Sequence, residues 1–275
     1  MNINKNSEAV EDFSKVIELK PDFYQAYVHR AKAYLKNCKL DEAENDLKYA
    51  ISKKSNEEYN ELLEHVKNAK SALKTLNKEK NKEEIINQLN IILNVCPRNL
   101  ELRMKRADLY IEIGQTEQAM GDLLKSTKLQ PENTDVLLRL SKLHLNLGEV
   151  DDSLKDVKEC LHRDPENKPC KSIFKQLKKI NRKKSSIEED QRNENWRSVV
   201  EKIDGEDGFL KEADKIGALN LRQFARNTLC QAYIKEKKAE SALKWCNMAI
   251  ELDDKNINNY LNRGESFMLK EDYEQ

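Results

Sequence analysis

The chain has 275 residues, of which 36% are charged and 6% are aromatic. Its 49 basic and 49 acidic residues balance, so the net charge does not favour binding to nucleic acid or to a membrane surface. The sequence holds no apolar run long enough to span a membrane, and its N-terminus lacks an apolar signal core. This composition is typical of a helix-rich chain with a thin apolar core.

Prolines and glycines recur with a period of 34 residues in the middle of the chain. Each period places two small residues where two helices would cross, with a ring residue between them. The glycine ends the first helix, and the proline closes the second because it cannot extend a running helix. The residues with this spacing are Pro97, Pro131, Pro165, Gly114, Gly148, Ala107, Ala119, Ser141, Ser153, Tyr110 and His144. The pattern predicts tetratricopeptide repeats, which stack into an all-α superhelical solenoid because one repeat cannot bury its apolar face alone.

In chain order, residues 7–20 have the pattern of the second helix of a repeat, and 24–55 form a complete helix pair. A long helix follows over about 57–80, starting from a Ser/Asn cap, and its partner is 82–96. The two clear repeats span 99–165. Because no first helix precedes 7–20, we expect the chain to begin inside a repeat.

A second long helix is predicted over 168–187, followed by a polar stretch at 183–195 that favours a loop. One more helix is predicted over 195–214, and another repeat spans 217–252. The last helix covers 257–270, so we expect the chain to stop before the second helix of its final repeat.

The helix over 168–184 is strongly basic and has two interpretations. One is a patch for nucleic acid or an acidic partner. The other is a solvated face opposite an apolar stripe formed by Ile173, Phe174, Leu177 and Ile180. The neutral net charge and the lack of interleaved aromatic residues favour the second interpretation, so we expect no nucleic-acid partner.

Two pairs of cysteines could be close in space. Cys230 and Cys246 face each other within one predicted helix pair, and Cys160 and Cys170 lie where two neighbouring helices would pack. Both pairs could meet the separation that a disulfide needs, but reduced cysteines packed in the core are equally compatible with the spacing. The remaining cysteines, Cys38 and Cys96, have no evident partner and are expected to be free.

The sequence offers no catalytic, cofactor or metal-binding motif. Nucleophile elbows, phosphate-binding loops and zinc-protease motifs are missing, so we expect no enzyme activity and no cofactor. The four histidines are scattered and no CxxC occurs, which argues against a metal site.

Apolar residues recur at repeat positions 5 and 12, which line the concave surface of such arrays. They are Val28, Leu35, Met104, Ile111, Leu138 and Leu145, with Leu261 and Met268 in the last helix. The lysine and asparagine that clamp a carboxylate in some repeat proteins are missing from positions 5 and 9. An apolar track of this kind suits extended apolar segments of other proteins. The alternative is that neighbouring repeats cover these side chains.

The run from Ile91 to Asn181, and above all the element ECLHRDPENKPC at 159–170, resembles the DnaJ co-chaperones of the endoplasmic-reticulum lumen that carry tetratricopeptide repeats. These proteins are also known as inhibitors of the double-stranded-RNA-activated protein kinase. The resemblance covers about 7–275. It implies two disulfides, Cys160–Cys170 and Cys230–Cys246, and an oxidising compartment. It also implies three subdomains: 1–56 (truncated), 57–187 and 188–275 (truncated).

By the same resemblance, the expected function is to bind unfolded or misfolded client proteins in the lumen of the endoplasmic reticulum. Delivery to BiP would require a J domain, which this chain lacks. The alternative is a scaffold or kinase inhibitor that docks a folded partner such as a kinase domain. No membrane partner is expected.

Overall fold

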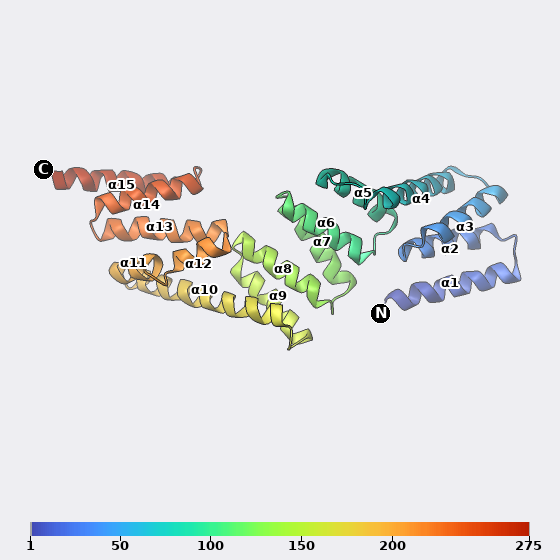
Figure 1. Cartoon of the computed structure of the whole chain (residues 1–275), viewed down its shortest axis with the longest axis horizontal. Helices are drawn as coiled ribbons and strands as arrows, with labels where there is room; N and C mark the ends of the chain where they lie inside the picture. The colour runs from blue at the N-terminus through green and yellow to red at the C-terminus, as the bar shows by residue number, and fades with distance from the viewer. Residues whose placement is uncertain (1, 275) are drawn as a thin grey trace. The chain divides into compact units, whose positions relative to one another are not determined.

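The structure, a computed structural model, describes the backbone of residues 2–274 and the side chains of residues 6–271. Every regular element in this part of the chain is a helix, and successive helices pack against each other within each unit (Figure 1). The predicted all-α repeat solenoid is therefore confirmed. None of the described helices is both long and apolar enough to cross a membrane.

The helices form two compact units, one ending at Pro131 and the other starting at Glu132. Unit 1 comprises α1 (Asn2–Leu19), α2 (Tyr24–Lys36), α3 (Leu40–Lys53), α4 (Glu57–Thr75), α5 (Lys82–Val95), α6 (Leu100–Glu112) and α7 (Thr116–Leu129). Unit 2 comprises α8 (Thr134–Leu147), α9 (Val150–Arg163), α10 (Lys168–Arg192), α11 (Trp196–Asp204), α12 (Phe209–Ile216), α13 (Leu219–Lys235), α14 (Ala239–Leu252) and α15 (Ile257–Glu274). The division into three subdomains stays a prediction.

Small residues lie where the two helices of a repeat cross. Alanines occupy these positions in α2–α3 and α6–α7, and all are fully buried: Ala31, Ala43, Ala107 and Ala119. In α8–α9 the same positions are Ser141 and Ser153, which are also fully buried. Ser153 Oγ donates to the backbone oxygen of Ser141 at 2.7 Å, and Ser141 Oγ donates to that of Ser153 at 3.1 Å. The serines thus keep the close helix crossing without leaving a buried hydroxyl unsatisfied.

Asparagine side chains begin several helices. Asn56 accepts a hydrogen bond from the backbone N–H of Tyr59 at 2.8 Å, which confirms the predicted cap before α4. Asn81, Asn99, Asn133 and Asn167 accept equivalent bonds at the starts of α5, α6, α8 and α10. These bonds satisfy backbone donors that the first helical turn leaves free.

The region after residue 183 differs from the prediction. The loop predicted over 183–195 is wrong, because α10 continues to Arg192 with Ile187 fully buried. The single helix predicted over 195–214 is also wrong, since α11 ends before Gly205 and α12 begins after Gly208. A Cβ at Gly208 would collide with the backbone oxygen of Ile203, so the tight turn between the helices requires glycine there.

The basic helix α10 buries the predicted apolar stripe. Ile173, Leu177 and Ile180 are buried and Phe174 is half-buried, which confirms the assignment of this face to the core. On the other face, Lys179 forms an ion pair with Asp207 at 3.2 Å and a second with Glu212 in α12. Part of the basic face of α10 therefore contacts acidic residues of its own unit.

Leu177→Asp should destabilise unit 2 by roughly 4 kcal/mol or more, because it removes a buried side chain and introduces a buried charge without a partner. The exposed Lys175 on the same helix provides the control. Lys175→Glu should change the unfolding free energy by less than about 0.5 kcal/mol. Urea unfolding followed by circular dichroism measures both, and equal stability of the two variants would contradict the assignment of the faces.

Candidate polypeptide-binding surface

The six residues predicted to line an apolar groove differ in exposure. Val28 and Leu35 in α2 are 3% and 5% exposed, and Leu138 and Leu145 in α8 are 9% and 6% exposed. Only Met104 and Ile111, both in α6, are half-buried. Leu35 belongs to the core of unit 1, and Leu138 and Leu145 belong to the core of unit 2. The structure therefore does not present the six side chains as one open track, and their role in client binding stays a prediction.

Three exposed apolar side chains of unit 1 lie close together in the sequence, at the end of α1 and in the turn that follows. Val16, Leu19 and Phe23 are 36%, 77% and 37% exposed, and we call them the α1 patch. Backbone hydrogen bonds hold the turn, since Lys20 N–H donates to the oxygen of Val16 and Phe23 N–H donates to that of Lys20. Sequence reasoning did not single out this patch. The available signal was the recurrence of apolar residues at Val16, Leu19 and Phe23 among charged neighbours.

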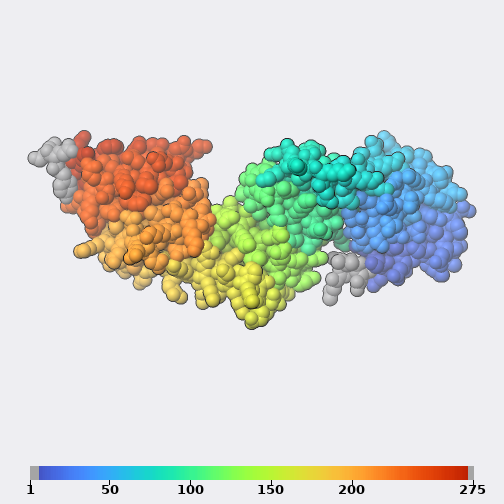
Figure 2. Space-filling view, viewed as in Figure 1, coloured from blue at the N-terminus to red at the C-terminus, as the bar shows by residue number. Residues whose placement is uncertain are grey.

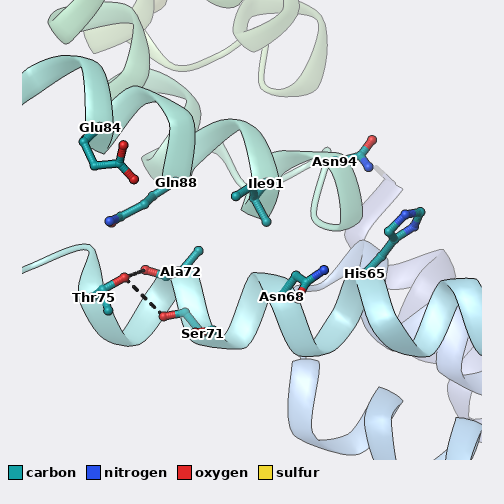
Figure 3. A pocket seen from close by; sticks show the side chains of 9 residues that line it. All are labelled: His65, Asn68, Ser71, Ala72, Thr75, Glu84, Gln88, Ile91 and Asn94. Atoms are coloured by element: carbon teal, nitrogen blue, oxygen red, sulfur yellow. Dashed lines mark hydrogen bonds between the residues drawn. The ribbon is translucent and has the colours of Figure 1, made fainter.

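A polar groove of about 420 Å³ runs between α4 and α5. Figure 3 shows His65, Asn68 and Thr75 on α4 facing Gln88 and other residues of α5 across it. Atoms of these two helices, cyan to teal in Figure 2, lie at the surface of unit 1. Gln88 is 8% exposed, points into the gap between the helices and has no hydrogen-bond partner for its amide oxygen among the described residues. The amide oxygen of Gln88 is therefore an unsatisfied buried acceptor in the wall of this groove.

A second pocket, of about 560 Å³, lies beside α5, α6 and α7. It shares Ile91 and Asn94 with the α4–α5 groove, so the two hollows adjoin each other along α5. Its lining includes Arg103, Arg106 and Lys125. Sequence reasoning missed this pocket. The signal was an arginine at position 103, where the repeat over 24–55 has the aromatic residue Tyr27.

The structure places the sulfur atoms of both predicted cysteine pairs at bonding distance. Cys160 and Cys170 join the end of α9 to the start of α10, with Cα atoms 6.5 Å apart. Cys230 and Cys246 join α13 to α14, with Cα atoms 5.0 Å apart. Each bond connects neighbouring helices within unit 2.

The expectation that Cys38 and Cys96 are free is corrected. The structure bonds them to each other, with Cα atoms 5.0 Å apart and a sequence separation of 58 residues. That separation matches neither a contact within one repeat nor one between matching positions of adjacent repeats, so the periodicity could not indicate the pair. Cys38 lies in the turn between α2 and α3 and Cys96 follows α5, so this bond ties two repeats of unit 1 together.

Removing the Cys38–Cys96 bond should cost more stability than removing either of the others, because it closes the longest loop. Chain-entropy arguments give about 4 kcal/mol for this bond and about 3 kcal/mol for Cys160–Cys170. Thermal unfolding of Cys38→Ala plus Cys96→Ala, compared with Cys160→Ala plus Cys170→Ala, measures the difference. Mass spectrometry after alkylation without reductant provides the check, and any alkylated cysteine in native protein would contradict the pairing at that position.

His144 occupies the ring position of the α8–α9 repeat and is half-buried. Its Nδ1 atom lies 2.6 Å from Oδ2 of Asp156, and its Nε2 atom lies 3.8 Å from Oε2 of Glu149. The hydrogen bond to Asp156 raises the pKa of His144 above its usual value, with smaller contributions from nearby carboxylates, while burial opposes the shift. His144 is therefore protonated more readily in the folded state than in the unfolded state.

Protonated His144 stabilises the fold, and this contribution is complete at a pH below the pKa of unfolded histidine, about 6.5. The contribution is lost once the pH exceeds the pKa of His144 in the folded state. Unit 2 should therefore lose thermal stability as the pH rises from below about 6.5 through the raised folded-state pKa of His144. His144→Gln keeps a polar partner for Asp156 but does not titrate, so it should reduce this pH dependence. Melting curves at several pH values measure it, and an unchanged slope in the variant would exclude His144 as the cause.

Known repeat proteins are similar to this chain in sequence and in structure. The tetratricopeptide repeat family matches residues 100–133. The crystal structure of the P58(IPK) TPR domain superposes with a TM-score of 0.80 at 28% sequence identity, covering 99% of this chain and 77% of that one. The chain is a tetratricopeptide-repeat protein.

The sequence relatives extend this result along the whole chain. DnaJ homolog subfamily C member 3 of Gallus gallus is 32% identical over 282 residues, covering 99% of this chain and 54% of the relative. The human protein of the same name is 31% identical over 286 residues, with 99% and 55% covered. The Cryptococcus neoformans tetratricopeptide repeat and J domain-containing co-chaperone DNJ1 is 25% identical over 303 residues, covering 100% of this chain and 58% of the relative. These findings confirm the resemblance seen in the sequence, and the chain spans about half the length of these relatives.

Proposed function

We propose that this repeat array is the polypeptide-holding part of a co-chaperone that binds unfolded or misfolded client proteins. The observation that carries the proposal is the similarity over 99% of the chain to DnaJ homolog subfamily C member 3, a name that assigns the relative to the DnaJ co-chaperones. The fold adds to this support, because repeat solenoids present extended surfaces that suit elongated ligands. Transfer of the client to BiP would require a J domain elsewhere in the intact protein.

The proposed compartment is the lumen of the endoplasmic reticulum. The six cysteines of the chain all lie in disulfides in the structure, and such bonds persist in oxidising compartments. This support is independent of the sequence relatives, because it rests on distances between sulfur atoms.

The proposed client contact is the α1 patch, together with the half-buried Met104 and Ile111. Unfolded polypeptides expose apolar side chains, and an exposed apolar patch can cover them without a conformational change in the array. Leu19 offers the most exposed apolar side chain of the patch. Val28 and Leu35 would reach a client only if neighbouring helices moved, because both are buried.

The array should suppress aggregation of an unfolded client without nucleotide, and Leu19→Asp plus Phe23→Asp should weaken this activity. Loss of two exposed apolar contacts should raise the half-maximal protein concentration about fivefold. The fold should survive, because Leu19 is exposed and Asp is a favourable residue at the Phe23 helix cap. Light scattering of a heat-denatured client, with circular dichroism of the array, measures both properties.

Leu219→Asp is the matched control, since Leu219 is 44% exposed at the start of α13 in the other unit. It should leave the activity within about twofold. Full activity in the α1-patch double variant would exclude that patch, and lack of holding activity in the unmodified array would contradict the proposed function itself.

A further inference from the structure

Two helix pairs of unit 1 each contain an arginine–aspartate ion pair at matching repeat positions. In α2–α3, Arg30 donates to both carboxylate oxygens of Asp46, at 2.8 and 2.7 Å. In α6–α7, Arg106 donates in the same way to Asp122, at 2.7 and 2.7 Å. Each arginine is also bonded to the preceding helix, through Ser14 in one case and Asn90 in the other. These two places occupy matching repeat positions, and we call them the α2–α3 corner and the α6–α7 corner.

The α2–α3 corner is filled and neutral. Tyr27 and Tyr49 stack there with ring centroids 4.1 Å apart. The hydroxyl of Tyr49 donates to the backbone oxygen of Pro21 at 3.0 Å. Arg30 faces Asp46, and Lys53, which lies over the Tyr49 ring, pairs with Asp22, so these charges balance.

The α6–α7 corner carries cations at the positions of those two tyrosines, Arg103 in place of Tyr27 and Lys125 in place of Tyr49. Arg103 Nη1 donates to Asp122 at 2.8 Å, and Nη2 donates to the oxygen of Pro97, the counterpart of Pro21, at 2.6 Å. The Arg103 side chain is 7% exposed, and its Nε has no partner among the described residues. Lys125 is exposed and has no ion pair among those the structure describes.

Replacement of the two tyrosines leaves three cations, Arg103, Arg106 and Lys125, lining the pocket of about 560 Å³, and the two arginines share the carboxylate of Asp122. The residues that line this pocket include Arg103, Arg106 and Lys125 but no acidic residue. A buried charge without a counter-charge is costly, and two arginines that share one aspartate leave one positive charge in excess before Lys125 is counted. A carboxylate entering the pocket would offset that charge through charge-assisted hydrogen bonds.

We propose that the α6–α7 corner binds a carboxylate of an extended polypeptide, either an acidic side chain or a free C-terminus. A polypeptide fits better than a free anion because the adjoining α4–α5 groove holds the unpaired amide oxygen of Gln88, which needs an N–H donor. Asn94 belongs to both hollows and can pair with a peptide group, while the 44% exposed Ile91 offers apolar contact between them. This inference stands apart from the proposed holding of apolar segments by the α1 patch.

Fluorescence anisotropy with three labelled eight-residue peptides tests the proposal on the whole array. The first peptide has two central glutamates and an amidated C-terminus, the second has glutamines in their place, and the third is the glutamine peptide with a free C-terminal carboxylate. The first or third peptide should bind about tenfold more tightly than the second, the effect of one charge-assisted contact. The comparison between the first and third distinguishes an acidic side chain from a peptide terminus as the source of the carboxylate.

Lys125→Glu should weaken binding of the preferred peptide about tenfold. Lys105→Glu is the charge-matched control, because Lys105 lies about 200° around α6 from Arg103 and does not line the pocket. It should leave the affinity within about twofold. Arg103→Tyr plus Lys125→Tyr recreates the residues of the α2–α3 corner, and should abolish the preference for a carboxylate while circular dichroism stays unchanged. Should this double variant misfold, Lys125→Glu against Lys105→Glu decides the question.

Equal binding of the amidated glutamine and glutamate peptides and of the free-carboxylate peptide would overturn the proposal. An equal loss of affinity in Lys105→Glu and Lys125→Glu would also overturn it, because the attraction would then be general. Stabilisation of the array by inorganic phosphate without carboxylate-dependent peptide binding would mean that the corner is a free-anion site.

Discussion

The close crossing of paired helices at small residues is the constraint on which this structure depends. Fully buried alanines at matching positions of α2–α3 and α6–α7 allow the backbones to approach, and larger neighbours then fill the space on both sides of the crossing. Where serines replace them in α8–α9, each hydroxyl is satisfied by the backbone of the other helix. The repeat therefore tolerates a polar substitution at its tightest point, provided that the hydrogen bonds close reciprocally.

Stacking of the helix pairs decides which apolar side chains stay exposed. Repeat positions 5 and 12 are buried in α2 and α8 but remain exposed in α15, where Leu261 and Met268 are 65% and 62% exposed. Apolar residues at these positions therefore serve the core wherever further helices of the unit cover them. Apolar side chains stay exposed at places that packing leaves open, such as the turn after α1, rather than along a continuous apolar track.

The two corners of unit 1 show how one framework can acquire different surfaces. The arginine–aspartate pair fastens the two helices in both, but its surroundings are two stacked tyrosines in one case and two extra cations in the other. A ring pair closes the space, whereas Arg103 and Lys125 lie beside a pocket with an excess of positive charge. The Cys38–Cys96 bond links the turn between α2 and α3 to the end of α5, which directly precedes the α6–α7 pair.

The sequence by itself determined the repeat period, the helical fold, the buried stripe of α10 and the two cysteine pairs implied by the family resemblance. The repeat period, the fold and the buried stripe are local or periodic, so spacing along the sequence reports them, whereas the cysteine pairs rested on the resemblance to a family. Only the tertiary structure decided that Cys38 meets Cys96, that Leu35 and Leu138 are buried, and that Arg103 and Arg106 share Asp122. It also decided that α10 extends through the polar stretch, because the burial of Ile187 outweighs the local preference for a loop. Burial and charge balance depend on which helices stack beside each other. The repeat of α4 and α5 is irregular, so the sequence period does not indicate which helices are neighbours there.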